Sequence, residues 1–290
     1  IGLVNRIHAQ TIRFQNGVRG GLAIAANALE LSGATVFVNN DGGTTMSSYS
    51  DLVLPAGSTI AKAYLYVEGY AATGITSVKF KYPGAASYVT LTSASSGFVA
   101  APKTSSYTQF IVDVTKLIPV NGFVSTVTAG GNAGTTGRYS VADISPVDNG
   151  NYGYGWALFV VYSNPSGKFR NVTIADGCNN FGIGTAITFD VNNVSVPSSG
   201  TVNAIVAVTG CWGDAGALYG DNIKFGKKGG TLTALKDPTT GSNSDVLNST
   251  IGFAVPNNVT IDGVSGMTNG NYVCRKPYNT FGTSANANSY

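Results

Sequence analysis

The chain has little charge. Asp, Glu, Lys and Arg make up 11% of its 290 residues, and the formal net charge is +3. The straight-chain helix formers are therefore scarce, whereas glycine is abundant (38 residues), which favours strands and turns over helices. The basic residues form no stripe with interleaved aromatics, so nucleic acid is not an expected partner. A surface of neutral hydroxyl and amide groups repels copies of itself only weakly, which favours assembly.

Histidine and glutamate are nearly absent. The single histidine is His8, and the two glutamates are Glu30 and Glu68. Nucleophilic catalysis usually needs a histidine base, and glycoside hydrolysis needs paired carboxylates, so we expect no enzyme and no cofactor. The segment Asn39-Asn40-Asp41 with Asp51 could supply oxygen ligands to calcium, but a turn is the favoured interpretation, and we predict no metal site.

Long hydrophobic runs are also missing. No apolar run reaches the roughly 18 to 20 residues of a transmembrane helix, which excludes membrane insertion through a helix. Residues Ile1 to Gln10 are similar to the end of a bacterial secretory signal, with a small-residue cleavage site near Ala9; the alternative is an ordered segment of the mature chain. We predict a secreted protein that is extracellular or on the cell surface.

Cysteine is rare, with three residues, and the spacing matches no zinc site. Cys178 and Cys211 flank two alternating runs, Phe181 to Val191 and Thr201 to Gly210. An antiparallel hairpin of these runs would bring the two cysteines opposite each other, which predicts a Cys178–Cys211 disulfide and leaves Cys274 unpaired.

Strand patterns recur along the whole chain, bounded by Gly, Pro, Asn or Asp. The clearest are Leu22 to Ala28, Thr35 to Val38, Thr59 to Glu68, Ser77 to Tyr82, Tyr107 to Val114, Phe123 to Ala129, Tyr139 to Ile144, Trp156 to Tyr162, Lys168 to Asp176, Ile183 to Val191, Thr201 to Thr209 and Gly252 to Ile261. Dipeptides such as Asn16-Gly17 and Asp262-Gly263 are typical of hairpin turns.

About a dozen strands predict an all-β fold with little helix: a large antiparallel β-sandwich of the jelly-roll or immunoglobulin-like type. We expect an extended N-terminal segment (1–15), a β-sandwich (16–274) and a C-terminal tail (275–290). The alternative for the sandwich is two packed sub-domains that divide near 165–178.

Two predicted strands differ in polarity. Trp156 to Tyr162 is apolar on both alternating faces, which is typical of a central strand covered on both sides. Lys62 to Glu68 is apolar on one face and carries tyrosines on the other, at the surface or under a covering layer. Tyrosines with flat amphipathic faces could stack on sugars, and the candidates for ligand stacking are Tyr64, Tyr66, Tyr152 and Tyr154, although sandwich strands carry tyrosine for packing as well.

Ordered phrases along the chain resemble a β-sandwich domain of secreted bacterial cell-surface, adhesin-like proteins. They are Arg19 to Leu29, Asp51 to Ile60, Ala63 to Tyr66, Gly137 to Ile144, Gly155 to Tyr162, Arg170 to Thr173 with Asp176-Gly177, and Tyr219 to Asp221. The resemblance spans most of residues 12–262 and implies a surface role without enzymatic activity. Where relatives carry an aromatic after Tyr64-Leu65-Tyr66, this chain has Val67-Glu68.

The N-terminal segment has the character of a donor strand, an extended segment that pairs with the open sheet edge of another subunit. Its subunit-contact candidates are Ile1, Leu3, Ile7, Ile12 and Phe14, and the tail from Arg275 to Tyr290 is the alternative donor. We therefore predict an extracellular structural protein that self-assembles with copies of itself into a surface filament, a pilus-like fibre or a lattice. The alternative is a monomeric adhesin or carbohydrate-binding module, whose partner would be a glycan.

Overall fold

The described part of the chain is built from strands and turns. A computed structural model describes residues 10–29, 39, 41, 43–104, 107–122, 134–146, 154–178, 186–194, 201–211, 222–236, 242–244, 246–247, 251–252, 260–261, 264–265, 272–275 and 278–282. No helix occurs among these residues, and the sheets are antiparallel apart from one short parallel pair. The predicted all-β class is therefore confirmed.

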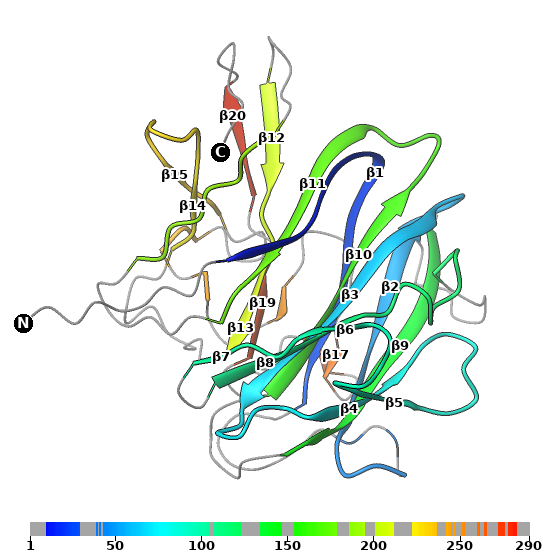
Figure 1. Cartoon of the computed structure of the whole chain (residues 1–290). Helices are drawn as coiled ribbons and strands as arrows, with labels where there is room; N and C mark the ends of the chain where they lie inside the picture. The colour runs from blue at the N-terminus through cyan, green and yellow to red at the C-terminus, as the bar shows by residue number, and fades with distance from the viewer. Residues whose placement is uncertain are drawn as a thin grey trace, which may run out of the picture.

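The main sheet has seven strands (Figure 1). Its order is β11-β1-β10-β3-β8-β6, with the short β7 also paired to β8. The strands are β1 (Thr11–Ala28), β3 (Thr59–Tyr70), β6 (Phe98–Ala100), β7 (Lys103–Thr104), β8 (Tyr107–Asp113), β10 (Tyr154–Ser163) and β11 (Phe169–Asp176).

A second sheet of four strands packs on one face of the main sheet. Its order is β2-β9-β4-β5, formed by β2 (Ser47–Pro55), β4 (Ser77–Lys81), β5 (Val89–Thr92) and β9 (Gly134–Ser145). The core between the sheets contains Leu65, Phe110 and Leu158 from the main sheet and Phe80 and Tyr139 from the second. This arrangement is the predicted β-sandwich.

The C-terminal part forms small sheets outside the sandwich. They pair β12 (Thr201–Ile205) with β20 (Tyr278–Gly282), β13 (Val208–Cys211) with β19 (Tyr272–Arg275) and β19 with β16 (Ile251–Gly252), as well as β14 (Lys224–Phe225) with β15 (Thr233–Ala234) and β17 (Thr260–Ile261) with β18 (Val264–Ser265). Ala207 and Thr209 contact the face of the main sheet that the second sheet leaves uncovered. We call this the outer face, and the face toward the second sheet the inner face.

Strand β1 changes its partner at Gly20. Thr11 to Arg19 pair with β11, whereas Gly20 to Ala28 pair with β10. The connection between β10 and β11 crosses β1 here, because Asn164 N donates to Arg19 O on one side and Gly20 N donates to Lys168 O on the other. Gly20 has φ 148°, and a Cβ at this position would lie 2.0 Å from Tyr162 O. Glycine is therefore required where the chain crosses.

The polarity predictions hold. Strand β10 is buried from Tyr154 to Val161 and lies between β1 and β3, as expected of a central strand. The tyrosine face of β3 lies under a covering layer, since Tyr64 and Tyr66 are buried. The predicted turn Asp262-Gly263 lies outside the described residues, between the paired Ile261 and Val264.

Two local predictions are wrong. Asn16-Gly17 lies inside β1, opposite Val172 and Asn171, because pairing with β11 overrides the turn preference of this dipeptide. The run from Ile183 to Val191 forms no strand over its described residues, 186–191.

The predicted Cys178–Cys211 disulfide is not formed. Cys178 is a buried free thiol that donates to Tyr107 O (3.4 Å). The hairpin that would have joined the two cysteines is absent, because β12 and β13 pair with β20 and β19 from the end of the chain. The side chains of Cys211 and Cys274 are not among those described.

Candidate functional site

A half-open depression lies where β1 and β11 pair. Its volume is about 320 Å³, and its sheet side is lined by Gln15, Asn16, Gly17, Phe169, Asn171 and Thr173. Asn193 and Val194 form the opposite wall. We call this depression the amide groove, because four of its eight lining residues carry a side-chain amide. No lining residue is ionisable.

Antiparallel register sets the floor of the amide groove. Gln15 lies opposite Thr173, Gly17 opposite Asn171 and Arg19 opposite Phe169, so these side chains share one face of the two-stranded pair. Phe169 is 64% exposed, and a Cβ on Gly17 would come within 2.3 Å of its ring. The ring therefore rests over the glycine, with much of its surface in solvent.

The far wall is tied to the floor by Gln15. Its Nε2 donates to Asn192 O (2.7 Å) and lies 3.4 Å from Thr173 Oγ1. Asn193 has φ 60°, a left-handed conformation that asparagine tolerates better than most residues. A hydrogen bond between distant segments thus connects the floor of the groove to its far wall.

The outer face of the main sheet carries a buried ion pair. Asp176 accepts two hydrogen bonds from Arg13, Nε to Oδ2 (2.6 Å) and Nη2 to Oδ1 (3.0 Å), and a third from the Tyr66 hydroxyl (3.2 Å). The hydroxyl of Tyr64 donates to Arg13 O (3.0 Å). Burial and the adjacent Asp176 carboxylate raise the pKa of Tyr66. Both tyrosines therefore serve to fix β1 and β11 to β3.

Glu68 is the second buried acid of the outer face, and it is 2% exposed. Gln109 Nε2 donates to its Oε1 (2.6 Å), and Thr209 Oγ1 of β13 donates to Oε2 (3.0 Å). Among the described residues Glu68 has no ion pair. Burial raises the pKa of Glu68 to about 7, and burial together with the nearby Glu68 raises the pKa of Cys178 to about 11. Glu68 therefore joins the C-terminal part to the sandwich by a bond that depends on protonation.

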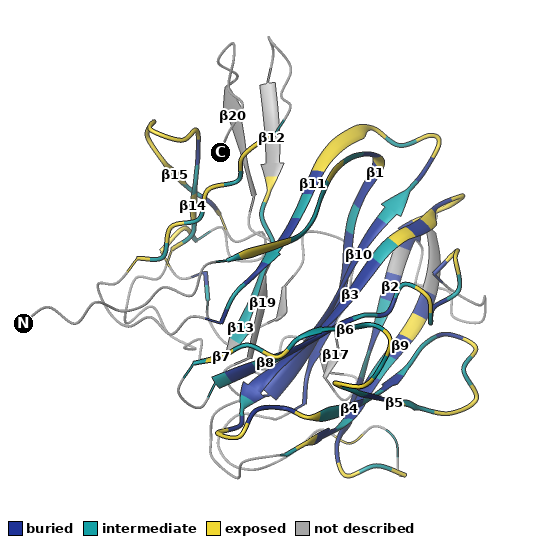
Figure 2. Ribbon diagram, in the orientation of Figure 1, coloured by how far each residue is buried: buried dark blue, intermediate teal, exposed yellow. Residues whose placement is uncertain are grey.

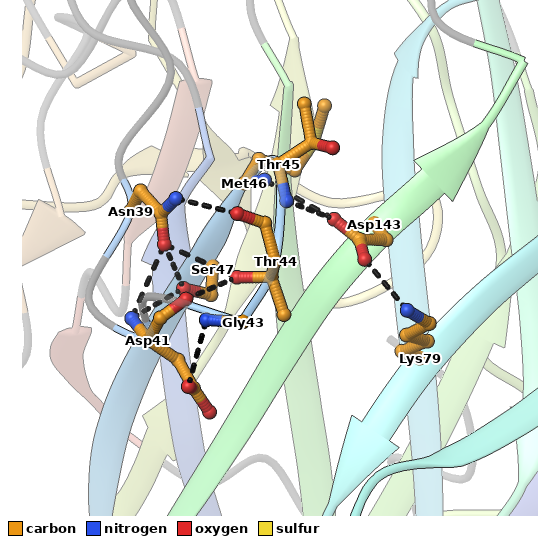
Figure 3. Close-up of polar contacts among 9 residues, drawn as sticks. All are labelled: Asn39, Asp41, Gly43, Thr44, Thr45, Met46, Ser47, Lys79 and Asp143. Atoms are coloured by element: carbon orange, nitrogen blue, oxygen red, sulfur yellow. Dashed lines mark hydrogen bonds and ion pairs between the residues drawn. The ribbon is translucent and has the colours of Figure 1, made fainter.

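A third polar cluster lies at the loop before β2 (Figure 3). Asn39 Oδ1 accepts hydrogen bonds from Asp41 N, Thr44 Oγ1 and Ser47 Oγ. Asp143 Oδ1 on β9 accepts from the backbone of Thr45 (2.7 Å). Burial opposes ionisation of Asp143, but hydrogen bonds from Lys79 and from backbone N–H groups outweigh it and lower its pKa. These hydrogen bonds close the loop, and they leave few side-chain oxygens of the cluster free to bind a cation.

The calcium alternative finds no support at this loop. Asp41 Oδ1 accepts from Gly43 N (3.4 Å), as expected of a turn, and Asp51 is bound by Arg138 through Nε (2.8 Å) and Nη2 (3.0 Å). The described residues contain no group of three acidic, histidine or cysteine side chains that could hold a metal ion.

Three of the four predicted ligand-stacking residues are buried. Tyr64, Tyr66 and Tyr154 are buried, and the Tyr154 hydroxyl donates to Tyr70 O. Tyr152 lies outside the described residues. The pattern of β3 already allowed a covering layer, but no local signal in the sequence shows which face is covered.

The predicted donor segments pair within their own chain where they are described. Ile12 and Phe14 lie in β1 opposite β11, and Phe14 packs against the outer-face core. In the tail, Tyr278–Gly282 forms β20 and pairs with β12. Of the other subunit-contact candidates, Ile1, Leu3 and Ile7 lie outside the described residues, as do 283–290.

Sequence reasoning missed the amide groove, because its floor joins residues about 150 positions apart. Asn16 and Gly17 were interpreted as a turn, and Phe169 is a single aromatic at the start of a strand. No family model, curated protein or solved structure matches the chain. Among the described residues no helix is long and apolar enough to span a membrane.

Proposed function

We propose that the protein is a secreted structural subunit that assembles with copies of itself by strand pairing at the edge of the main sheet. One observation carries this proposal: β11 is an eight-residue edge strand whose partner in the described part of the chain is β1 alone. Figure 2 shows an exposed stretch where β11 begins, and its first three residues, Phe169 to Asn171, are all exposed. An open edge of this kind accepts an extended strand from another chain.

The donor we propose is the segment that precedes β1. β1 begins at Thr11 opposite Asp176, the last residue of β11, so the chain's own β11 offers no further partner to the residues before Thr11. Nine extended residues span about 30 Å, which matches the length of an eight-residue strand. Ile7 and Ala9 place apolar side chains on one face of such a strand. The low charge of the chain weakens repulsion between subunits.

Truncation tests this proposal. A variant without residues 1–9 keeps all of β1, and a variant without residues 283–290 is the control for the alternative donor at the tail. By light scattering and negative-stain electron microscopy we expect the full chain and the control to form polymers, and the first variant to remain monomeric. Polymers of unchanged length from the first variant would exclude the N-terminal donor. A full chain that stays monomeric at all concentrations would favour the adhesin instead.

A further inference from the structure

We infer that the amide groove is a binding site for a short neutral oligosaccharide. Sugar rings combine an apolar face with a rim of hydroxyl groups, and each hydroxyl both donates and accepts hydrogen bonds. A complementary site offers an exposed aromatic ring beside groups that also donate and accept hydrogen bonds. Amide side chains are such groups, because each carries both donors and an acceptor. The groove combines the two, with Phe169 beside the amide side chains of Gln15, Asn171 and Asn193.

Phe169 is the large apolar side chain of the groove that is exposed. The other large apolar side chains exposed among the described residues, such as Val120 and Leu232, lie outside the groove. Phe169 is held over Gly17, where a side chain would displace its ring. A glycine under the ring thus sets the ring's position beside the amides, which is the arrangement that stacking on a sugar requires.

The volume and charge of the groove restrict the class of ligand that it could bind. A volume of about 320 Å³ is at the lower end of small-molecule sites, and the half-open shape lets a chain of sugars continue past the groove. Of the basic residues near the groove in sequence, Arg13 binds Asp176, Arg19 donates to Gly167 O (3.1 Å) and Arg170 donates to Gly20 O, and Lys168 is not a lining residue. With no ionisable lining residue, the site offers nothing to pair with a uronate or sialate carboxylate, which favours a neutral sugar.

Two contacts order the site before any ligand binds. Its floor is a pair of strands in register, and its far wall is bonded to Gln15. Preorganisation reduces the entropy lost on binding. The inference goes beyond self-assembly, because the groove uses side chains on the face of β1 and β11, whereas subunit pairing would use the backbone edge of β11.

A glycan array probed with the labelled full chain tests this inference. The array carries neutral oligosaccharides of two to six hexose, pentose or N-acetylhexosamine units, together with acidic oligosaccharides of the same length. We expect binding to at least one neutral series, and competition with the free oligosaccharide then gives its affinity. An array reports binding whether the protein is monomeric or polymeric, so failure of the assembly proposal does not affect the result.

Matched variants assign the binding to the groove. Phe169→Ala removes the ring and Gly17→Ala displaces it, and each should weaken binding about tenfold, the equivalent of about 1.4 kcal/mol, because stacking on the ring is lost. Phe169→Tyr keeps a ring and should bind as the wild type does, as should Val120→Ala, which removes exposed apolar surface elsewhere. No binding to any neutral series, binding to acidic series alone, or equal affinity of the wild type and both groove variants would overturn the inference.

Discussion

The two faces of the main sheet are stabilised by different means. The inner face packs apolar side chains against the second sheet, and the polar tips of its aromatics are bonded, as in Trp156 Nε1 to Ser48 Oγ (2.8 Å). The outer face also has an apolar cluster, but it buries Glu68 and the Arg13–Asp176 pair as well. The stability of the inner face should therefore depend on how well its apolar side chains fill the core. The stability of the outer face should depend on charge and pH as well.

The largest effect is expected on the inner face. Phe110→Ala leaves a cavity at a fully buried position next to Phe98 and should lower the free energy of unfolding by about 4 kcal/mol. The loss should be the same at every pH at which the protein is folded, because no ionisable group is removed. Urea unfolding followed by tryptophan fluorescence measures it. The same substitution at the exposed Phe169 should cost less than about 0.5 kcal/mol, and equal losses at the two sites would contradict the packing of Phe110.

The next effect concerns Glu68. Its pKa rises from the ordinary 4.5 to about 7 in the folded protein, so the unfolded chain releases this proton first as pH rises. The contribution of Glu68 to the free energy of unfolding is therefore highest below pH 4.5, falls between pH 4.5 and 7, and is constant above pH 7. The total loss due to Glu68 is about 3 kcal/mol.

Glu68→Gln should remove this slope, since an amide does not titrate; its oxygen can still accept from Gln109, and its NH2 group can donate to the Thr209 hydroxyl. Urea unfolding of both proteins at several pH values between 4.5 and 7.5 tests this directly. Parallel curves for wild type and variant would show that Glu68 is not the group that titrates.

The smallest effect is the difference in stability lost when two arginine–aspartate pairs of similar geometry are broken. Asp176→Asn leaves Arg13 charged without its partner at a site where the aspartate side chain is 3% exposed, and it should cost about 2 kcal/mol. Asp51→Asn breaks the Arg138 pair, whose aspartate is 26% exposed, and should cost less than about 1 kcal/mol. Both are measured by thermal unfolding at low and high salt. A larger loss at Asp51 would reverse the order that burial predicts.

Local patterns in the sequence predict most of the sandwich but little of the candidate site. Strand β10 could be recognised because both of its alternating faces are apolar, and β3 because one face is apolar and the other carries tyrosine. The pairing of the strands could not be predicted, because Asn16 lies opposite Val172 in a register that no local sequence signal encodes. Cys178 shows the same limit: the alternation of 183–191 suggested a hairpin, but the partners of β12 and β13 come from about 65 to 80 residues later.

The position of β1 also has a consequence during synthesis. This strand leaves the ribosome before its partners in the main sheet, β10 and β11, which are complete only at Asp176, almost 150 residues after Ala28. At about 5 to 20 residues per second, β1 waits roughly ten seconds or more with its apolar residues unpaired. During that time the apolar residues of β1 are open to contact with neighbouring nascent chains.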